Sequence, residues 1–485
     1  MTYPAKDTAD ATLDSAITWV ATAYSIAEII MVTMAGWFST LIGRKQLYLW
    51  SFGLFTLGSV LCGTAVSFPQ MLFYRVLQGL GGGSLIPVSQ AILRESFPHE
   101  EQGMAMAIFG MGVVLAPAMG PIVGGWLTDH YGWPWIFFIN VPVCVVGMFM
   151  VGAFVHDPSY LRRGVKKVDW GGIALLAVTL TAMQIVLERG QSENWFESNM
   201  IVLGTFIGIA ALIALVFWEL KIPEPVVNFR VLRNLPLTLG SAMGIIFGVA
   251  LFGTTFILPQ FTQNLLGYPA FQAGLVLAPR AFALLLFMPV VGRLYNHVDA
   301  KILVILGVAI TFWSYYDLAG LSLEAGFWNL IPSMLIMGIG MPFIFITLST
   351  LSLATVPHPD MTDATSMYTL SRRIGGNIGY ALTATLVARG EQIHRVSLVG
   401  HVNAYNPIYT QYSRFVKKVL APHAGLNAQA ARHAVKALAE RIVNAQSTMM
   451  AYNDVSLIFG ILFLCIVPLV FLLPGREALT GKSGH

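Results

Sequence analysis

Three charged side chains stand inside long apolar stretches, where they could bind protons or anions. Glu28 lies about 17 Å into its apolar run, and Arg75 and Arg280 lie in two others. A charge in lipid is costly, so each side chain should face a cavity or a partner. Burial favours the neutral form of a carboxyl group, whereas a nearby arginine favours its charged form. We therefore expect Glu28 to carry or relay protons under the influence of Arg75.

Each of these residues also has a structural interpretation. Glu28 could be a hydrogen-bonded contact between helices, and this interpretation stays open. Arg75 is only about 8 Å from the start of its run, so its side chain could instead reach the near membrane interface. Arg280 could attract an acidic substrate or pair with an acid that the sequence does not identify.

The sequence lacks the motifs that are typical of ATP binding, metal binding and nucleic-acid binding. No GxxxxGK[ST] loop is present, so ATP is not the expected energy source. The histidines form no HExxH motif and the three cysteines form no CxxC pair, so we expect no metal site, no cofactor and no enzyme activity. Basic residues are not interleaved with aromatic ones in a patch, which argues against nucleic-acid binding.

Helices that cross a membrane must position the three charged residues. Hydrophobic residues make up 56% of the chain and charged residues only 11%, whereas soluble domains carry about 25% charged residues. The apolar runs are long enough to cross about 30 Å of hydrocarbon and do not alternate like barrel strands. We expect an all-α membrane protein with thirteen spans. These spans are residues 17–38, 47–66, 70–92, 102–126, 135–155, 170–188, 200–219, 237–259, 272–292, 302–322, 328–353, 366–388 and 453–474.

The positions of lysine and arginine predict the orientation of these spans. Basic residues occur in every second connection, and the short alternate connections contain none. The positive-inside rule places the basic connections, and with them the C-terminus, in the cytoplasm. We assign Arg372 and Arg373 to this basic set, just before the twelfth span. The loop 389–452, with an expected amphipathic helix at 428–446, then lies on the opposite side.

Glycine, proline and basic residues also form recurring motifs. GWFSTLIGRK (36–45) and GRLYNHVD (292–299) share a pattern at the ends of two spans, which suggests two related halves. YRVLQGLGGG (74–83) and APAMGPIVGG (116–125) lie within spans. Their glycines allow close helix packing, and the prolines of the last motif each remove a backbone donor.

In these motifs the chain resembles the major facilitator superfamily, and within it the 14-span drug/proton antiporters and the EmrB-like efflux permeases. The resemblance extends over essentially the whole chain and implies roles for matching residues. Arg75 and Gln78 match a family motif, whereas Glu28 and Arg280 are singled out by their own positions in apolar runs; we expect Glu28 and Arg75 to couple protons, and Arg280 and Gln78 to lie along the substrate or ion pathway. The implied conformational residues are Gly36, Gly43, Arg44, Lys45, Gly79, Pro117, Gly120, Pro121, Gly124 and Gly125.

The resemblance further implies the major facilitator fold, in which two helical bundles and two linker helices surround a central cavity. The family has one more span before residue 17, so we expect its first span to be missing. The expected domains are a periplasmic segment 1–16, a five-span bundle 17–155, loops and linker spans 156–236, five spans of a second bundle 237–388, a periplasmic loop 389–452, and a last span with a cytoplasmic tail 453–485.

The function implied by this resemblance is proton-driven antiport. Such a protein exports lipophilic drugs, dyes or fatty acids across the bacterial inner membrane by alternating access, with the proton gradient as its energy source. Implied partners are a lipophilic small-molecule substrate, protons, a periplasmic adaptor protein and an outer-membrane channel. The alternatives are a truncated non-transporting paralogue or membrane sensor, and a proton-coupled importer.

Overall fold

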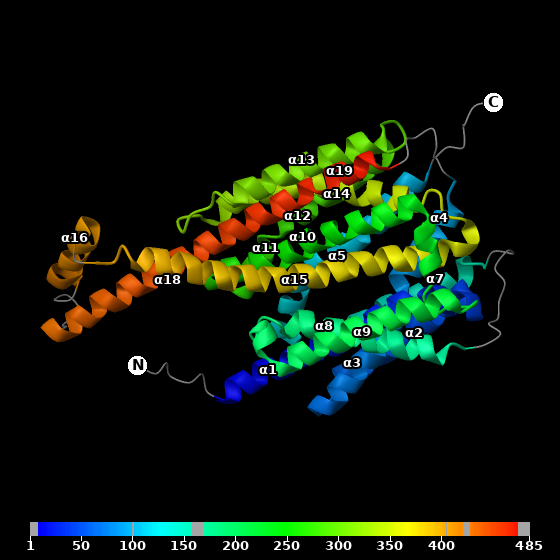
Figure 1. The fold of residues 1–485 in the computed structure, drawn as a ribbon, viewed down its shortest axis with the longest axis horizontal. Helices are drawn as coiled ribbons and strands as arrows, with labels where there is room; N and C mark the ends of the chain where they lie inside the picture. The colour runs from blue at the N-terminus through cyan, green and yellow to red at the C-terminus, as the bar shows by residue number, and fades with distance from the viewer. Residues whose placement is uncertain (1–7, 99–100, 158–167, 404, 421–426, 474–485) are drawn as a thin grey trace.

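The structure is a computed structural model that describes residues 8–98, 101–157, 168–403, 405–420 and 427–473. Helices account for nearly all of this part of the chain (Figure 1). The first bundle consists of α1 (Thr8–Ile42), α2 (Arg44–Gly63), α3 (Phe68–Gly82), α4 (Leu85–Ser96), α5 (Gln102–Tyr131), α6 (Trp135–Phe138) and α7 (Asn140–Phe154).

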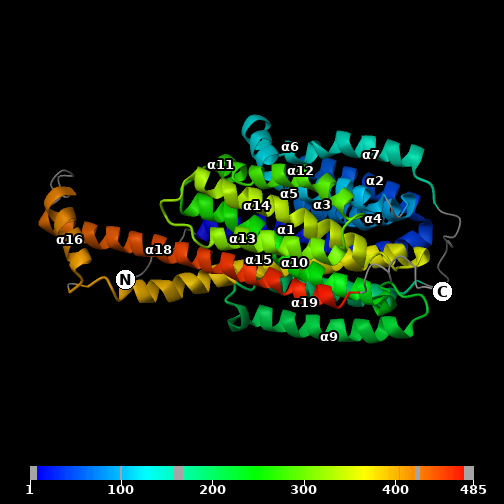
Figure 2. The same cartoon turned by 90° about the horizontal axis from the view of Figure 1, so that it is seen from above.

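A linker hairpin follows, made of α8 (Trp170–Arg189), the short turn η1 (Trp195–Glu197) and α9 (Asn199–Lys221). Figure 1 shows α8 and α9 side by side, and Figure 2 shows α9 along one side of the molecule. The second bundle and its extension consist of η2 (Phe229–Arg233), α10 (Leu235–Asn264), α11 (Ala270–Leu275), α12 (Ala278–Leu294), α13 (Ala300–Leu318), α14 (Phe327–Ser352), η3 (His358–Asp360), α15 (Met361–Val399), α16 (Pro407–Phe415), η4 (Val416–Leu420), α18 (Ala428–Leu464) and α19 (Ile466–Phe471).

The predicted all-α membrane fold is confirmed. Eleven helices or helix pairs of the described chain are long and apolar enough to cross a membrane. α5 and α15 cover the two remaining predicted spans, 102–126 and 366–388. Large apolar side chains face outward, for example Phe149 at 77% and Phe206 at 71% exposure. Lipid is the solvent that suits such a surface.

α15 contains the predicted span 366–388 and crosses the second bundle, although it is less apolar than the eleven helices or helix pairs above. Its polar side chains Thr362, Thr365 and Thr369 are buried, because α1, α4, α8, α10 and α18 all pack against it. A helix that is surrounded by protein has little need of a lipid-compatible surface. The assignment of Arg372 and Arg373 to a connection before this span is therefore wrong. Both residues lie inside α15.

The two ends of the bundles can be told apart by their elements. At one end, here called the Arg44 end, α1 ends, α2 begins and α15 begins. At the other, the α16 end, α15 and α18 extend beyond the remaining helices and carry α16 at their tip (Figures 1 and 2). The expected amphipathic helix 428–446 is not a separate cap, since α18 runs without a break through it and into the last span.

Some sequence expectations fall outside the described residues. They concern residues 1–7 of the segment 1–16, the basic connection at 158–167 and the tail 474–485. Helix α1 begins at Thr8, nine residues before the span predicted from residue 17.

Candidate functional site at the seam between the bundles

α1 of the first bundle and α15 of the second pack against each other, and their contact is here called the seam. At the Arg44 end of the seam, a Cβ atom on Gly36 would lie 1.8 Å from Oδ1 of Asp363, so only glycine permits this approach. Nearby, the hydroxyl of Thr365 donates a hydrogen bond of 3.0 Å to the carbonyl of Pro87 on α4. Direct contacts therefore close the seam at this end.

The predicted loop motif 36–45 anchors the same end. Gly43 joins α1 to α2 with φ of 91°, a conformation that favours glycine. Arg44 is 1% exposed, forms an ion pair with Glu95 of α4 and donates a hydrogen bond of 3.4 Å to the carbonyl of His358. Lys45 donates through its backbone N–H to Oδ1 of Asp157, at 2.9 Å, and through Nζ to the carbonyl of Gly152.

The carboxylate of Glu28 meets the guanidinium of Arg373 near the middle of the seam. The Glu28 side chain is 9% exposed and that of Arg373 is 33% exposed. This pair joins the two bundles, since Glu28 belongs to α1 and Arg373 to α15. The expected control of Glu28 by Arg75 has no direct contact in this structure, because the partner of the carboxylate is Arg373. Sequence reasoning missed Arg373 because it was read as a connection residue.

Arg75 lies in α3 and contacts neutral groups. Its Nη1 donates to Oε1 of Gln78 at 3.1 Å, and Gln78 in turn donates to the hydroxyl of Ser59 at 2.8 Å. The guanidinium lies 4.7 Å from the ring centroid of Phe137 and 5.7 Å from that of Tyr24, within the range of cation–π attraction. Tyr24 also interacts electrostatically with Glu28 and Arg373, so Arg75 reaches the ion pair through a shared neighbour.

Close packing at Gly79 holds this group together. A Cβ atom on Gly79 would lie 2.5 Å from the carbonyl oxygen of Tyr24, so α3 touches the backbone of α1. The predicted motif residues Gln78 and Gly79 thus fix the position of Arg75 against α1. Gln78 itself is 2% exposed.

Arg280 is 2% exposed and lies within the second bundle. Its Nη2 donates to the hydroxyl of Thr255 on α10 at 3.1 Å, and its Nη1 lies 4.0 Å from the sulfur of Met337 on α14. None of the ion pairs among the described residues includes Arg280. This cation is therefore held by neutral groups, and the structure does not bring it together with Glu28 or Arg75.

The motif 116–125 behaves differently from the expectation of tight helix packing. α5 continues through Pro117 and Pro121, and Cβ atoms built on Gly120, Gly124 and Gly125 meet nothing within 4 Å among the described residues. Instead, α5 packs closely in its first half. A Cβ atom on Gly103 would lie 2.6 Å from the carbonyl oxygen of Gly292 on α12. In this conformation the motif glycines leave one side of α5 uncovered.

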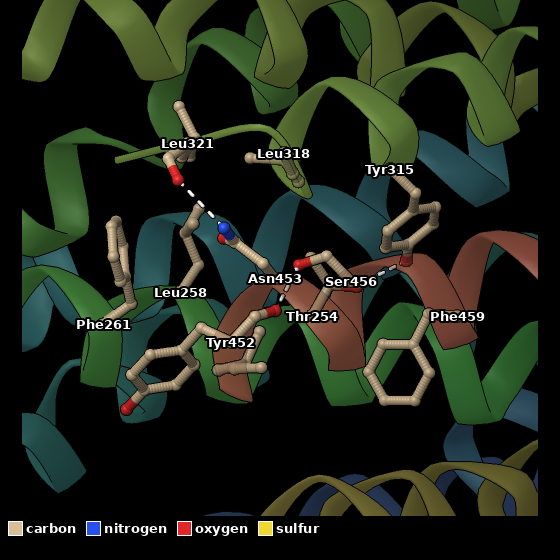
Figure 3. A pocket seen from close by; sticks show the side chains of 11 residues that line it. Thr254, Leu258, Phe261, Tyr315, Leu318, Leu321, Tyr452, Asn453, Ser456 and Phe459 are labelled. Atoms are coloured by element: carbon tan, nitrogen blue, oxygen red, sulfur yellow. Dashed lines mark hydrogen bonds between the residues drawn. The ribbon is translucent and has the colours of Figure 1, made fainter. Parts of the chain in front are cut away.

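A small cavity lies in the second bundle between α10, α13 and α18 (Figure 3). Its volume of about 20 Å³ suits a single water molecule. Thr254 and Tyr315 hydrogen-bond at one end, and Asn453 donates to the carbonyl of Leu321 at the other, at 2.9 Å. Such a cavity is too small for an amphipathic substrate.

Comparisons with known proteins agree with this architecture. A model of the Major Facilitator Superfamily matches residues 3–380. The chain is 32% identical over 395 residues to the multidrug export protein EmrB of Escherichia coli K12, covering 80% of this chain and 76% of EmrB. It is also 28% identical over 473 residues to the fatty acid resistance protein FarB of Neisseria gonorrhoeae, covering 96% of this chain and 90% of FarB.

Solved structures show the same fold at low sequence identity. A structure of the proton:xylose symporter XylE covers 99% of this chain and 91% of its own chain with a TM-score of 0.57, at 13% identity. The human organic anion transporter MFSD10 covers 92% of this chain and 83% of its own chain with a TM-score of 0.53, also at 13% identity. At this identity the likeness concerns the fold alone.

Proposed function

Because the chain belongs to the major facilitator superfamily, we propose that it is an antiporter that exports hydrophobic or amphipathic small molecules in exchange for protons. The observation that carries this proposal is the ion pair between Glu28 and Arg373, which joins the two bundles through the interior of the protein. A proton that binds Glu28 neutralises one partner of that pair. The two bundles can then separate at the seam at a lower free-energy cost.

Substrate export follows from the same contact. With Glu28 charged, the seam is held together, and with Glu28 neutral, one inter-bundle contact is weakened. A change in the tilt of the bundles exposes the space between them to alternate sides of the membrane. Export of the substrate is then linked to the uptake and release of a proton at Glu28. No cofactor takes part.

The energy of the proton gradient is sufficient to drive the export of substrate against a concentration gradient. One elementary charge that moves across 100 mV supplies about 2.3 kcal/mol. At 25 °C this sustains a substrate gradient of roughly 50-fold per charge, since 1.36 kcal/mol corresponds to a factor of ten.

The substrate class rests on the relatives. EmrB is named for multidrug export and FarB for resistance to fatty acids. We propose lipophilic drugs, dyes and fatty acids as substrates of this chain. Arg280, a buried cation without an acidic partner among the described ion pairs, favours substrates that carry an acidic group.

The orientation is part of the proposal. Arg44, Lys45 and Arg94 lie near the Arg44 end, which we place in the cytoplasm of a bacterial cell, with the chain in the inner membrane. The C-terminus is then cytoplasmic and α16 lies in the periplasm. There, a periplasmic adaptor protein that leads to an outer-membrane channel would meet the extension formed by α15, α16 and α18.

Transport into everted membrane vesicles tests this function. The wild-type chain should accumulate at least one of three labelled probes (ethidium, tetraphenylphosphonium and decanoate) when a pH gradient is applied, and lose it when the gradient is dissipated. Glu28→Gln should abolish the response to the gradient. The matched control is Glu440→Gln, which removes a carboxylate from an exposed ion pair with Arg395. Gradient-driven accumulation by Glu28→Gln equal to wild type would remove Glu28 from the mechanism.

A further inference from the structure

The linker helix α8 packs along the seam, against both α1 and α15. Leu176 and Leu180 of α8 are buried in one apolar cluster with Ile29 and Val32 of α1 and with Met367 of α15. The linker is thus packed against both bundles, at the place where Glu28 and Arg373 meet. A spacer that merely connected two bundles would have no need of such contacts.

Polar contacts fasten the end of α8 to both bundles as well. Gln184 of α8 accepts a hydrogen bond from the amide of Asn377 on α15. After the helix, Nε1 of Trp195 donates to the hydroxyl of Thr385 on α15 at 3.0 Å. On the other side, the guanidinium of Arg189 lies 4.4 Å from the ring centroid of Trp19 on α1.

Glu188 stands in the last turn of α8, between these contacts. Its carboxyl group hydrogen-bonds with Thr22 of α1 and with Gln184. Its second oxygen, Oε2, is buried and has no hydrogen-bond partner. A buried carboxylate oxygen without a donor is unfavourable, and a bound proton relieves that cost. Glu188 is therefore a candidate proton-binding group.

Electrostatic contacts connect Glu188 to the ion pair of the seam. Tyr380 on α15 interacts with both Glu188 and Arg373. Six residues of α1, about 9 Å of helix, separate Thr22 from Glu28, and Thr22 lies on the side of the α16 end. A proton that enters from the α16 end therefore meets Glu188 before it meets Glu28.

We propose that Glu188 is a second proton-binding site, which receives the proton at the α16 end and passes it to Glu28. This inference rests on the proposed function. In the transfer, the proton leaves the carboxyl group of Glu188 and binds the carboxylate of Glu28, by way of the Tyr380 hydroxyl or water. Glu188 becomes a carboxylate beside Arg189, and neutral Glu28 releases Arg373. The facing charged and titratable groups are Arg189 on α8, Arg373 and Tyr380 on α15, and Tyr24 and Glu28 on α1.

Two assays on the full-length chain in proteoliposomes test the proposal. The first measures pH-gradient-driven uptake of whichever of ethidium, tetraphenylphosphonium and decanoate the wild type transports best. The second measures counterflow of the same probe without a gradient, which needs the alternating motion but no net proton transfer. We expect Glu188→Gln to lose gradient-driven uptake by about tenfold or more, as for loss of a proton-transferring group, and to keep counterflow within about twofold.

Two further variants complete the test. Glu188→Asp retains a carboxyl group and should restore most gradient-driven uptake. Glu197→Gln removes an exposed carboxylate from the neighbouring turn and should behave as wild type. Unchanged gradient-driven uptake in Glu188→Gln overturns the proposal, and so does an equal loss of uptake and counterflow, which would show a purely structural role. If the wild type transports no probe in response to the gradient, the proposed function itself fails.

Discussion

The guanidinium of Arg373 on α15 meets the carboxylate of Glu28 on α1, so that two residues 345 positions apart in the chain form an ion pair between the bundles. The Glu28 side chain is mostly removed from solvent, whereas about one third of the Arg373 side chain is exposed. An ion pair in this position can both hold the bundles together and respond to a proton. Transport and stability should therefore change together when it is altered.

The first prediction concerns the energetic coupling of this pair. Arg373→Gln leaves the Glu28 carboxylate buried without its partner and should lower the thermal stability of the purified protein. The double variant Glu28→Gln/Arg373→Gln removes both charges and should be more stable than Arg373→Gln alone. A double-mutant cycle should give a coupling of about 0.5–3 kcal/mol. Additive effects of the two substitutions on the melting temperature would contradict the pairing.

The second prediction contrasts two glycines. Gly36→Ala places a methyl group against Asp363 and should prevent closure of the seam at the Arg44 end, with loss of transport and of thermal stability. Gly124→Ala meets no neighbour in this conformation and should retain or gain stability, since alanine favours a helix over glycine by about 1 kcal/mol.

A transport measurement shows whether Gly124 is needed for a helix contact at another stage of the proposed cycle. If the uncovered side of α5 packs against another helix at a different stage of the cycle, Gly124→Ala should reduce transport while the melting temperature stays the same or rises. Transport equal to wild type would show that the motif 116–125 needs its glycines for no such contact.

The third prediction concerns Arg280. Arg280→Met replaces the buried cation by an apolar side chain of similar length, and replacement of buried charges by packed apolar groups is often neutral for stability. The variant should fold, yet lose transport of anionic decanoate while cationic tetraphenylphosphonium is moved as well as before. The discriminating result is the ratio of the two transport rates. An equal change in both rates would show that Arg280 does not select charge.

The fourth prediction concerns the tip of the extension. Ile408 is 77% exposed and Phe415 is 51% exposed on α16, although both are apolar. The proposed orientation places α16 outside the membrane, where exposed apolar residues are typical of an interaction surface. Ile408→Ser/Phe415→Ser should reduce recovery of a co-expressed periplasmic adaptor in a pull-down without changing the amount of transporter in the membrane. Recovery of adaptor equal to wild type would place its binding surface elsewhere.

Much of the fold could be predicted from one rule: an apolar run long enough to cross the hydrocarbon core of a membrane forms a spanning helix. The expected span 200–219 reappears as α9, which is strongly apolar because it lies on the outside of the molecule. The same rule located the span 366–388 within α15 but did not allow for its arginines, because α15 is enclosed by other helices and therefore carries buried threonine, serine and arginine. Arg373 was consequently read as a residue of a connection rather than of a span.

The candidate site was harder to predict than the helices. Glu28 stood out as an acid in an apolar run, but its partner depends on which helices meet at the seam. No local spacing reveals a contact across 345 positions. Glu188 was equally hidden, because it closes a helix next to Arg189 and resembles an ordinary charged helix end. Only the packing of α8 on both bundles brings it to the seam.

The unbroken length of α15 has a mechanical consequence. At 1.5 Å per residue, its 39 residues form a rod of about 58 Å that begins at the Arg44 end and carries α16 beyond the opposite end. If such a rod turns by about 10° around its midpoint, its tip moves by about 5 Å. In the proposed transport cycle, a tilt of α15 at the seam would therefore also displace α16, and a protein bound to α16 would move with it.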